Sequence, residues 1–294
     1  MAPMPKESAV SDAIPPPPPE WARHDAVWIG FPSHAELWED DLAPAQAEVA
    51  AFAAAVDAGG AGEQVLLVAA DESAAAAARA LVPARVSVVV AAFGDIWLRD
   101  TGPILLGDGT ARSFRFNGWG GKYQLTGDED IGARLAAARG IAVERCAWVL
   151  EGGAIDGDGS GLAVTTEQCL LNPNRNPGMT KAEVEARLRA DLGLERILWL
   201  GDGLANDHTD GHVDNLARFV APGTIAIPVA AGADDPNATV YADAAARAEA
   251  FGLTVAPLPS PGRVLRDGEA IPASYMNFYI GNAAVVVPLY GAPN

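Results

Sequence analysis

The stretch Gln64-Val-Leu-Leu-Val-Ala69, followed by Glu72–Leu81 and then by Val86–Val90, decides the fold class. The first and third segments are short apolar runs rich in β-branched residues, and they predict buried strands. The segment between them is rich in alanine and long enough for a helix. The order strand, helix, strand predicts an α/β fold.

The same alternation continues on both sides of this stretch. Further strands are expected at Ala26–Phe31, Ile104–Leu106, Ser113–Phe116, Ala142–Leu150, Ile197–Leu200, Leu216–Val220, Thr224–Pro228, Leu253–Ala256 and Ala283–Pro288. Further helices are expected at Pro44–Val56, Glu129–Ala138, Lys181–Asp191 and Val240–Phe251. No change in composition marks a second domain, so one α/β domain is expected over residues 20–294. Residues 1–19 end in the run Pro15–Pro19 and are expected to form a disordered tail.

The chain carries 38 acidic residues against 20 Lys and Arg, for a formal net charge of −18. A field of this sign repels nucleic acid and attracts small cations, although acidity can also serve solubility alone. The two cysteines fit a reducing compartment rather than a disulfide scaffold. No secretory pattern opens the chain, and no apolar run reaches the roughly 18 residues of a membrane span. We therefore expect a cytoplasmic protein with neither nucleic-acid nor membrane partners; the oligomeric state is not indicated.

Polar residues interrupt the apolar background in two places that follow predicted strands. The first is Asp95-Ile-Trp-Leu-Arg-Asp100-Thr-Gly-Pro103. Its charged side chains are costly to bury unless they pair with each other or bind a ligand. An Asp–Arg pair that fixes a turn would also explain why charged residues occur here. The second is Glu151-Gly-Gly153, which taken alone is more typical of a surface turn.

Two further polar stretches contain histidine or cysteine. Residues 206–215 hold two histidines and three aspartates. On an extended strand His212 and Asp214 would share a face, and a carboxylate beside an imidazole raises its pKa and fixes its tautomer for proton transfer. A solvated polar loop is the alternative. In the other stretch Cys169 precedes two leucines, which predicts a buried, unreactive thiol.

Taken in order from Pro19 to Asn294, these motifs resemble the agmatine deiminase family. The matching segments are Pro19-Glu-Trp21 with Val27-Trp28, Trp97–Pro103, Glu151–Gly153, Cys169–Pro177, Gly211–Phe219, Ala273–Tyr279 and Val286–Gly291. The resemblance implies a pentein fold, a propeller of five ββαβ modules whose last module is incomplete here. It also implies hydrolytic deimination of a guanidinium substrate, foremost agmatine to N-carbamoylputrescine and ammonia, through a covalent cysteine intermediate. It implies no cofactor and no metal.

The resemblance further implies roles for individual residues. Asp100 and Asp214 would hold two edges of the guanidinium through charge-assisted hydrogen bonds. Glu151 would bind it too and orient His212, which would protonate the departing ammonia and then activate water. Trp97 and Trp119 would flank the aliphatic arm or the cation. The expected substrate-binding residues are Asp95, Trp97, Asp100, Trp119 and Asp214.

The nucleophile implied by the resemblance is a cysteine that follows a Gly-rich turn close to the C-terminus. The sequence ends at Asn294 before any such turn, and neither Cys146 nor Cys169 lies in a matching context. We therefore expect a chain shortened at its C-terminal end, without deiminase activity as it stands.

Two other function classes remain open. In a metal hydrolase, His208 and His212 would bind the ion with Asp214, although Thr209 and Gly211 are poor helix formers. The second open class is a non-catalytic pentein that binds a partner.

Within the enzyme class, free arginine and peptidyl-arginine are alternatives to agmatine. Free arginine would need a cationic partner for its carboxylate, and the available residues are Arg99, Arg115, Arg175 and Arg218.

Overall fold

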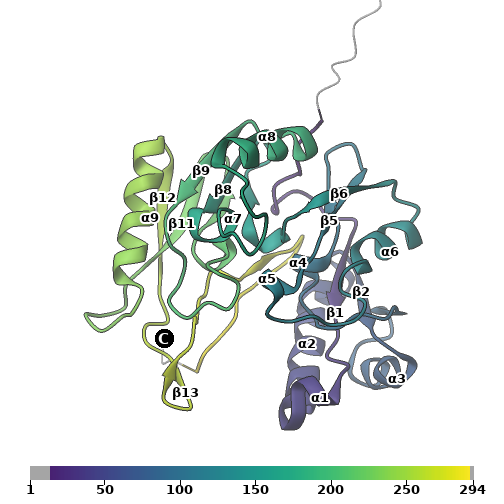
Figure 1. Cartoon of the computed structure of the whole chain (residues 1–294). Helices are drawn as coiled ribbons and strands as arrows, with labels where there is room; N and C mark the ends of the chain where they lie inside the picture. The colour runs from purple at the N-terminus through teal and green to yellow at the C-terminus, as the bar shows by residue number, and fades with distance from the viewer. Residues whose placement is uncertain (1–13, 292–294) are drawn as a thin grey trace, which may run out of the picture.

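The computed structural model describes residues 14–291 and confirms the α/β fold (Figure 1). Within these residues the strands form four sheets of three strands and two small hairpins. None of the helices described has both the length and the apolar character needed to cross a bilayer.

Most elements begin and end within a few residues of the predicted positions. The strands are β1 (Ala26–Gly30), β2 (Gln64–Ala69), β3 (Ser87–Val90), β4 (Ile104–Leu105), β5 (Ala111–Arg115), β6 (Val143–Val149), β7 (Asp156–Gly157), β8 (Leu162–Thr166), β9 (Arg196–Leu200), β10 (Arg218–Ala221), β11 (Thr224–Val229), β12 (Thr254–Pro259), β13 (Leu265–Arg266), β14 (Glu269–Ala270), β15 (Tyr279–Ile280) and β16 (Val285–Val286). The α-helices are α1 (Ala35–Trp38), α2 (Leu42–Asp57), α3 (Glu72–Leu81), α4 (Leu98–Thr101), α5 (Gly118–Gly121), α6 (Ile131–Ala138), α7 (Glu167–Leu170), α8 (Lys181–Leu192) and α9 (Ala238–Phe251). Short 3₁₀ helices are η1 (Glu39–Asp41), η2 (Ala58–Gly60), η3 (Gly152–Ala154) and η4 (Val213–Asn215).

Three consecutive sheets repeat one pattern, in which an antiparallel pair is followed by a helix and a parallel strand. They are β4-β5-β6 with α6, β7-β8-β9 with α8, and β10-β11-β12 with α9. This is the ββαβ module of the pentein fold. The sheet β1-β2-β3 departs from it, because all three strands are parallel and α2 and α3 form the crossovers. Of the five modules expected, residues 14–291 thus show three in complete form.

The helices bury their apolar faces on the sheets, which leaves the turns after the strands free to carry polar groups. Val184, Leu188 and Leu192 of α8 are fully buried in one such core. Each buried side chain of this size contributes about 1.5–3 kcal/mol. A capping box of Thr180 and Glu183 fixes where α8 begins.

The Pro-rich stretch lies against the domain where the structure describes it. The Gly107 N–H donates to the Pro16 carbonyl oxygen at 3.1 Å, and Ile14 packs against the core that contains α8 (Figure 1). Ile14–Pro19 therefore differ from the disordered tail predicted up to residue 19, because proline carbonyls accept hydrogen bonds and proline rings still bury apolar surface. Residues 1–13 lie outside the described residues. A single domain over residues 20–294 stays a prediction.

Candidate active site

Four residues from three separate segments meet around Gly153 in η3. A methyl group in place of a Gly153 hydrogen would lie 2.6 Å from Asp100 Oδ1, 2.7 Å from Asp214 Oδ2 and 2.7 Å from His212 Nδ1. The two carboxylate oxygens are thus no farther apart than the sum of the first two distances, 5.3 Å. Glu151 directly precedes this 3₁₀ turn and is fully buried. Any side chain at position 153 would fill the point where these groups converge.

The Asp100 carboxylate in α4 is oriented by two donors. Its Oδ1 accepts the Gly153 N–H at 2.9 Å, and its Oδ2 accepts the indole N–H of Trp119 at 2.8 Å. Trp119 is buried in a tight turn at φ 52°, a conformation that costs energy for a side chain of this size. Trp119, expected to flank the substrate, thus binds the carboxylate itself and holds it in place.

Arg175 links Glu151 to the loop that precedes His212 through hydrogen bonds. Its Nε donates to Glu151 Oε1 at 2.6 Å, its Nη1 to Asp210 Oδ2 at 2.5 Å and its Nη2 to the Thr209 carbonyl at 2.7 Å. This role of Arg175 was not predicted from the sequence. The motif Cys169–Pro177 contains Arg175, but the partners of its guanidinium come from two other segments.

The local structure around His212 corrects one expectation. His212 and Asp214 do not lie on an extended strand. His212 directly precedes the 3₁₀ turn η4, which contains Asp214, and β10 starts only at Arg218. The predicted strand Leu216–Val220 was therefore placed too early, and the period-two argument was wrong. The two side chains meet because η4 packs against η3.

The pKa values of this group follow from burial and crowding of negative charge. Burial alone would lower the pKa of His212, but Asp100, Cys169 and Asp214 together raise it well above its usual range. Burial raises the pKa of Glu151, although Arg175 and His212 oppose this. Burial also raises the pKa of Asp214 to about 6, with Asp100 adding to the effect. His212 therefore carries a proton at neutral pH, as a general acid must before it can protonate a leaving group.

Two atoms of the site are buried and have no hydrogen-bond partner among residues 14–291. They are Glu151 Oε2 and His212 Nε2. Leaving a buried polar atom unpaired costs about 1–3 kcal/mol, more when the group is charged. A ligand that satisfied both atoms would recover this cost.

Asp95 and Trp97 were also expected to bind substrate. The Trp97 indole N–H donates to Asp95 Oδ2 at 2.9 Å, so these two side chains bind each other. Trp97 is 49% exposed and lines a separate cavity of about 570 Å³ together with Glu20 and Arg99. Asp100, Glu151, His212 and Asp214 do not line this cavity.

The metal-hydrolase alternative needs His208 beside His212. The His208 ring instead stacks on Tyr123, and its Nδ1 lies 2.6 Å from the Tyr123 hydroxyl. In the described part of the chain, the potential ligand atoms that cluster within 4.8 Å of one another belong to Glu151, Cys169 and His212. This group contains neither His208 nor Asp214. Cys169 is fully buried, as predicted, and burial raises the pKa of its thiol.

A second charge cluster, which we call the paired cluster, comprises Glu20, Arg99, Asp156 and Arg218. The Arg218 side chain is fully buried, whereas that of Arg99 is partly exposed. Arg218 donates to Glu20 Oε2 at 2.7 Å and to Asp156 Oδ1 at 2.9 Å, and Arg99 also donates to Glu20. These guanidinium groups are neutralised inside the protein. We call Asp100, Glu151, His212 and Asp214 the open cluster.

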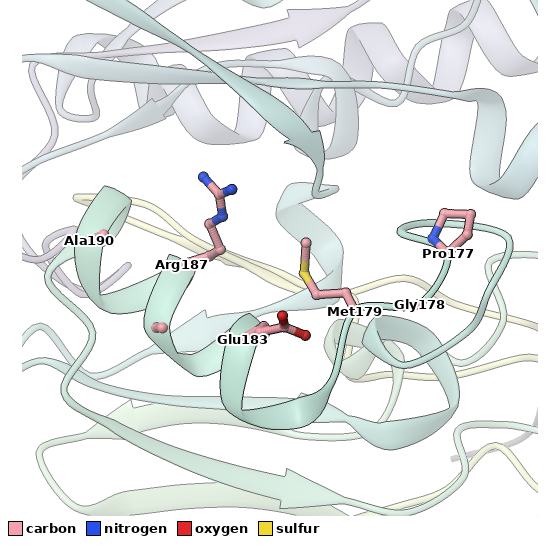
Figure 2. Close-up of a pocket in the computed structure, with 7 residues that line it drawn as sticks. Pro177, Gly178, Met179, Glu183, Arg187 and Ala190 are labelled. Atoms are coloured by element: carbon pink, nitrogen blue, oxygen red, sulfur yellow. The ribbon is translucent and has the colours of Figure 1, made fainter.

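A pocket of about 550 Å³ lies elsewhere, on α8 and the turn before it. Figure 2 shows Glu183 and Arg187 on this helix with Pro177 and Met179 on the turn. It shares no residue with the open cluster or the paired cluster.

Comparison with known proteins places the chain in a family. The sequence model of the Porphyromonas-type peptidyl-arginine deiminase family matches residues 17–294. The chain belongs to this family. An agmatine deiminase of Stutzerimonas stutzeri is 36% identical over 94% of this chain and 83% of the relative.

Solved structures of family relatives superpose closely. A cysteine-to-serine variant of the C. jejuni agmatine deiminase with substrate bound has a TM-score of 0.87 at 28% identity, over 98% of this chain and 86% of that one. The agmatine deiminase of Enterococcus faecalis has a TM-score of 0.85 at 29% identity, over 96% of this chain and 87% of that one. The family resemblance inferred from the motifs is confirmed.

Proposed function

We propose that the protein deiminates a guanidino compound hydrolytically and that agmatine is its substrate. The observation that carries this proposal is the convergence of Asp100, Asp214 and His212 around Gly153. Carboxylate oxygens no more than 5.3 Å apart suit the two edges of one planar guanidinium, which donates charge-assisted hydrogen bonds of about 2.7–2.9 Å. Agmatine would yield N-carbamoylputrescine and ammonia, a route to putrescine. The relatives named agmatine deiminase support this choice.

The open cluster supplies binding and proton transfer. A cysteine thiolate attacks the guanidinium carbon, and the C–N bond breaks as His212 gives its proton to the departing ammonia. His212 then takes a proton from water, whose oxygen displaces the thiolate. Asp100 and Asp214 raise the pKa of His212 and so keep it charged until the proton is needed. The C. jejuni variant, in which a cysteine is replaced by serine, holds substrate, which fits a cysteine nucleophile.

Neither cysteine of the described chain has the low thiol pKa of a nucleophile. Burial and Asp191 raise the pKa of Cys146 to about 11, and burial raises that of Cys169. The attacking residue is therefore not assigned to either of them. Binding, rather than turnover, is the readout that decides the proposal for this chain.

The arginine side chains favour a substrate without a free carboxylate. Arg99, Arg175 and Arg218 all donate to carboxylates within the protein. Arg115 at the end of β5 is exposed. Agmatine needs no cationic partner, and the charge of −18 suits a dication. Peptidyl-arginine also lacks a free carboxylate and is the second candidate, because the matched family is named for that activity.

The deciding experiment is calorimetric titration of the chain with agmatine, putrescine, arginine and benzoyl-arginine amide. We expect agmatine to bind at least about tenfold more tightly than putrescine, which lacks the guanidinium that makes the charge-assisted bonds. Ammonia and N-carbamoylputrescine are measured in the same samples. Equal affinity for agmatine and putrescine would contradict the proposal, and preference for benzoyl-arginine amide would select the second candidate. The cytoplasmic location and the absence of nucleic-acid and membrane partners stay predictions.

A further inference from the structure

A buried thiol adjoins the carboxylate and the imidazole of two open-cluster residues. Glu151 follows β6, Cys169 lies in α7 and His212 precedes η4. One potential ligand atom from each lies within 4.8 Å of the other two, and all three residues are buried. Carboxylate, thiolate and imidazole together are a donor set for Zn²⁺.

Glu151 and His212 each have one buried atom without a hydrogen-bond partner among the described residues. Glu151 Oε1 accepts from Arg175 at 2.6 Å, whereas Oε2 has no partner. His212 Nδ1 lies 3.6 Å from Asp100 Oδ1, whereas Nε2 has no partner. In metal sites a carboxylate commonly lies beside the ring nitrogen that does not bind the metal, and it orients the imidazole. Asp100 stands in this position relative to Nδ1 of His212.

We infer that Glu151, Cys169 and His212 form a binding site for one thiophilic divalent cation and that Zn²⁺ is the ion the donor set selects. Tetrahedral Zn²⁺ needs ligand atoms about 3.4–3.6 Å apart. Because the three atoms lie within 4.8 Å of one another, side-chain shifts of about 1 Å or less reach this geometry. Three protein ligands leave the fourth position for water. Ca²⁺ and Mg²⁺ are excluded because they take oxygen ligands.

The surrounding charges permit a cation at this position. Asp100 and Asp214 add two carboxylates close to His212. Arg175 is the opposing charge, but Asp210 and the Thr209 carbonyl also bind it. On binding, the thiol of Cys169 and the imidazolium of His212 each lose a proton to solvent, and the thiolate and the neutral imidazole become the ligands.

Occupation by Zn²⁺ would use both unpartnered atoms, including the nitrogen of His212. The ion and the proposed substrate would then compete for the same imidazole. This consequence rests on the proposed function, whereas the binding of Zn²⁺ does not.

The test is calorimetric titration of the chain with Zn²⁺ and optical titration with Co²⁺. The two cysteines provide a matched pair of variants, Cys169→Ala and Cys146→Ala. We expect the parent chain and Cys146→Ala to bind one Zn²⁺ with equal affinity. They should also show the ultraviolet thiolate-to-Co²⁺ absorption band. Cys169→Ala should bind Zn²⁺ at least tenfold more weakly and lack the band.

Cys169→Ser keeps the side-chain volume and serves as a second variant if Cys169→Ala does not fold. Equal Zn²⁺ affinity of the parent chain and the folded Cys169 variant would overturn the inference, as would a missing thiolate band in the parent. A parallel agmatine titration separates the two proposals. Zn²⁺ binding without agmatine binding would support the metal site and contradict the proposed function. Agmatine binding without Zn²⁺ binding would support the proposed function and contradict the metal site.

Discussion

The paired cluster and the open cluster both contain Asp and Glu carboxylates, but they differ in whether their charges are satisfied within the protein. They meet in sequence at residues 151–156, where Glu151 belongs to the open cluster and Asp156 to the paired cluster. In the paired cluster two guanidinium groups face two carboxylates. In the open cluster three carboxylates surround one histidine, and two buried atoms remain unpaired. Complete internal pairing indicates a structural role, whereas incomplete pairing indicates a place for a ligand.

The pKa values show the same difference. Glu20 is buried, which by itself raises its pKa, yet Arg99, Arg218 and the Ile280 N–H lower it to about 2. Asp214 is also buried, and its pKa is raised to about 6. Burial acts in the same direction on both carboxylates, so the facing cations decide the outcome.

The largest expected effect is on stability, from Arg218→Met. The substitution leaves Asp156 without its guanidinium partner, while Glu20 keeps only Arg99. Breaking a buried ion pair costs about 3–5 kcal/mol. Urea unfolding should show this loss. Arg115→Met, at an exposed position, is the control and should change the free energy of unfolding by less than about 0.5 kcal/mol. A similar effect of both substitutions would remove the distinction between the clusters.

Lowering the pH should reduce the stabilisation that the paired cluster contributes, within a defined pH range. Because the folded-state pKa of Glu20 is about 2 against 4.5 when unfolded, its stabilisation is complete above pH 4.5 and is lost as the pH falls toward 2. The shift corresponds to about 3 kcal/mol. The unfolding free energy of the parent should therefore fall more steeply between pH 4.5 and 2 than that of Glu20→Gln. Parallel curves for the two proteins would show that Glu20 is not held by these cations.

In the open cluster a charge removal should affect binding rather than stability. Asp100→Asn removes one ionic acceptor and should weaken agmatine binding by about 1.5–3 kcal/mol, roughly 10- to 150-fold. The free energy of unfolding should stay the same or rise, because crowded carboxylates repel each other. Asp202→Asn makes the same charge change at an exposed position and should leave both quantities unchanged. Equal agmatine affinity of Asp100→Asn and the parent would exclude Asp100 as a guanidinium ligand.

The smallest effect is expected from Trp119→Phe, which removes the indole N–H that orients Asp100. The loss of one hydrogen bond should weaken agmatine binding by about 0.5–1.5 kcal/mol, roughly 2- to 10-fold. Trp97→Phe, whose indole binds Asp95, sharpens the comparison. A larger effect at Trp97 than at Trp119 would place the substrate toward the cavity of about 570 Å³ that Trp97 lines.

The sequence by itself determined the α/β class, most element positions and the identity of the open-cluster residues. The first two depend on the spacing of apolar side chains along a single segment, which can be read locally. The residue identities came from the order of short motifs that resemble the family, since no single motif indicates a shared site.

Only the tertiary structure decided how these residues are used. The contacts of Arg175 with Glu151, of Trp119 with Asp100 and of Arg218 with Glu20 join segments between 19 and 198 residues apart. Local patterns carry no information on such partners, because they are fixed by how the modules pack. For the same reason Cys169 could be predicted as buried, but its position beside His212 could not.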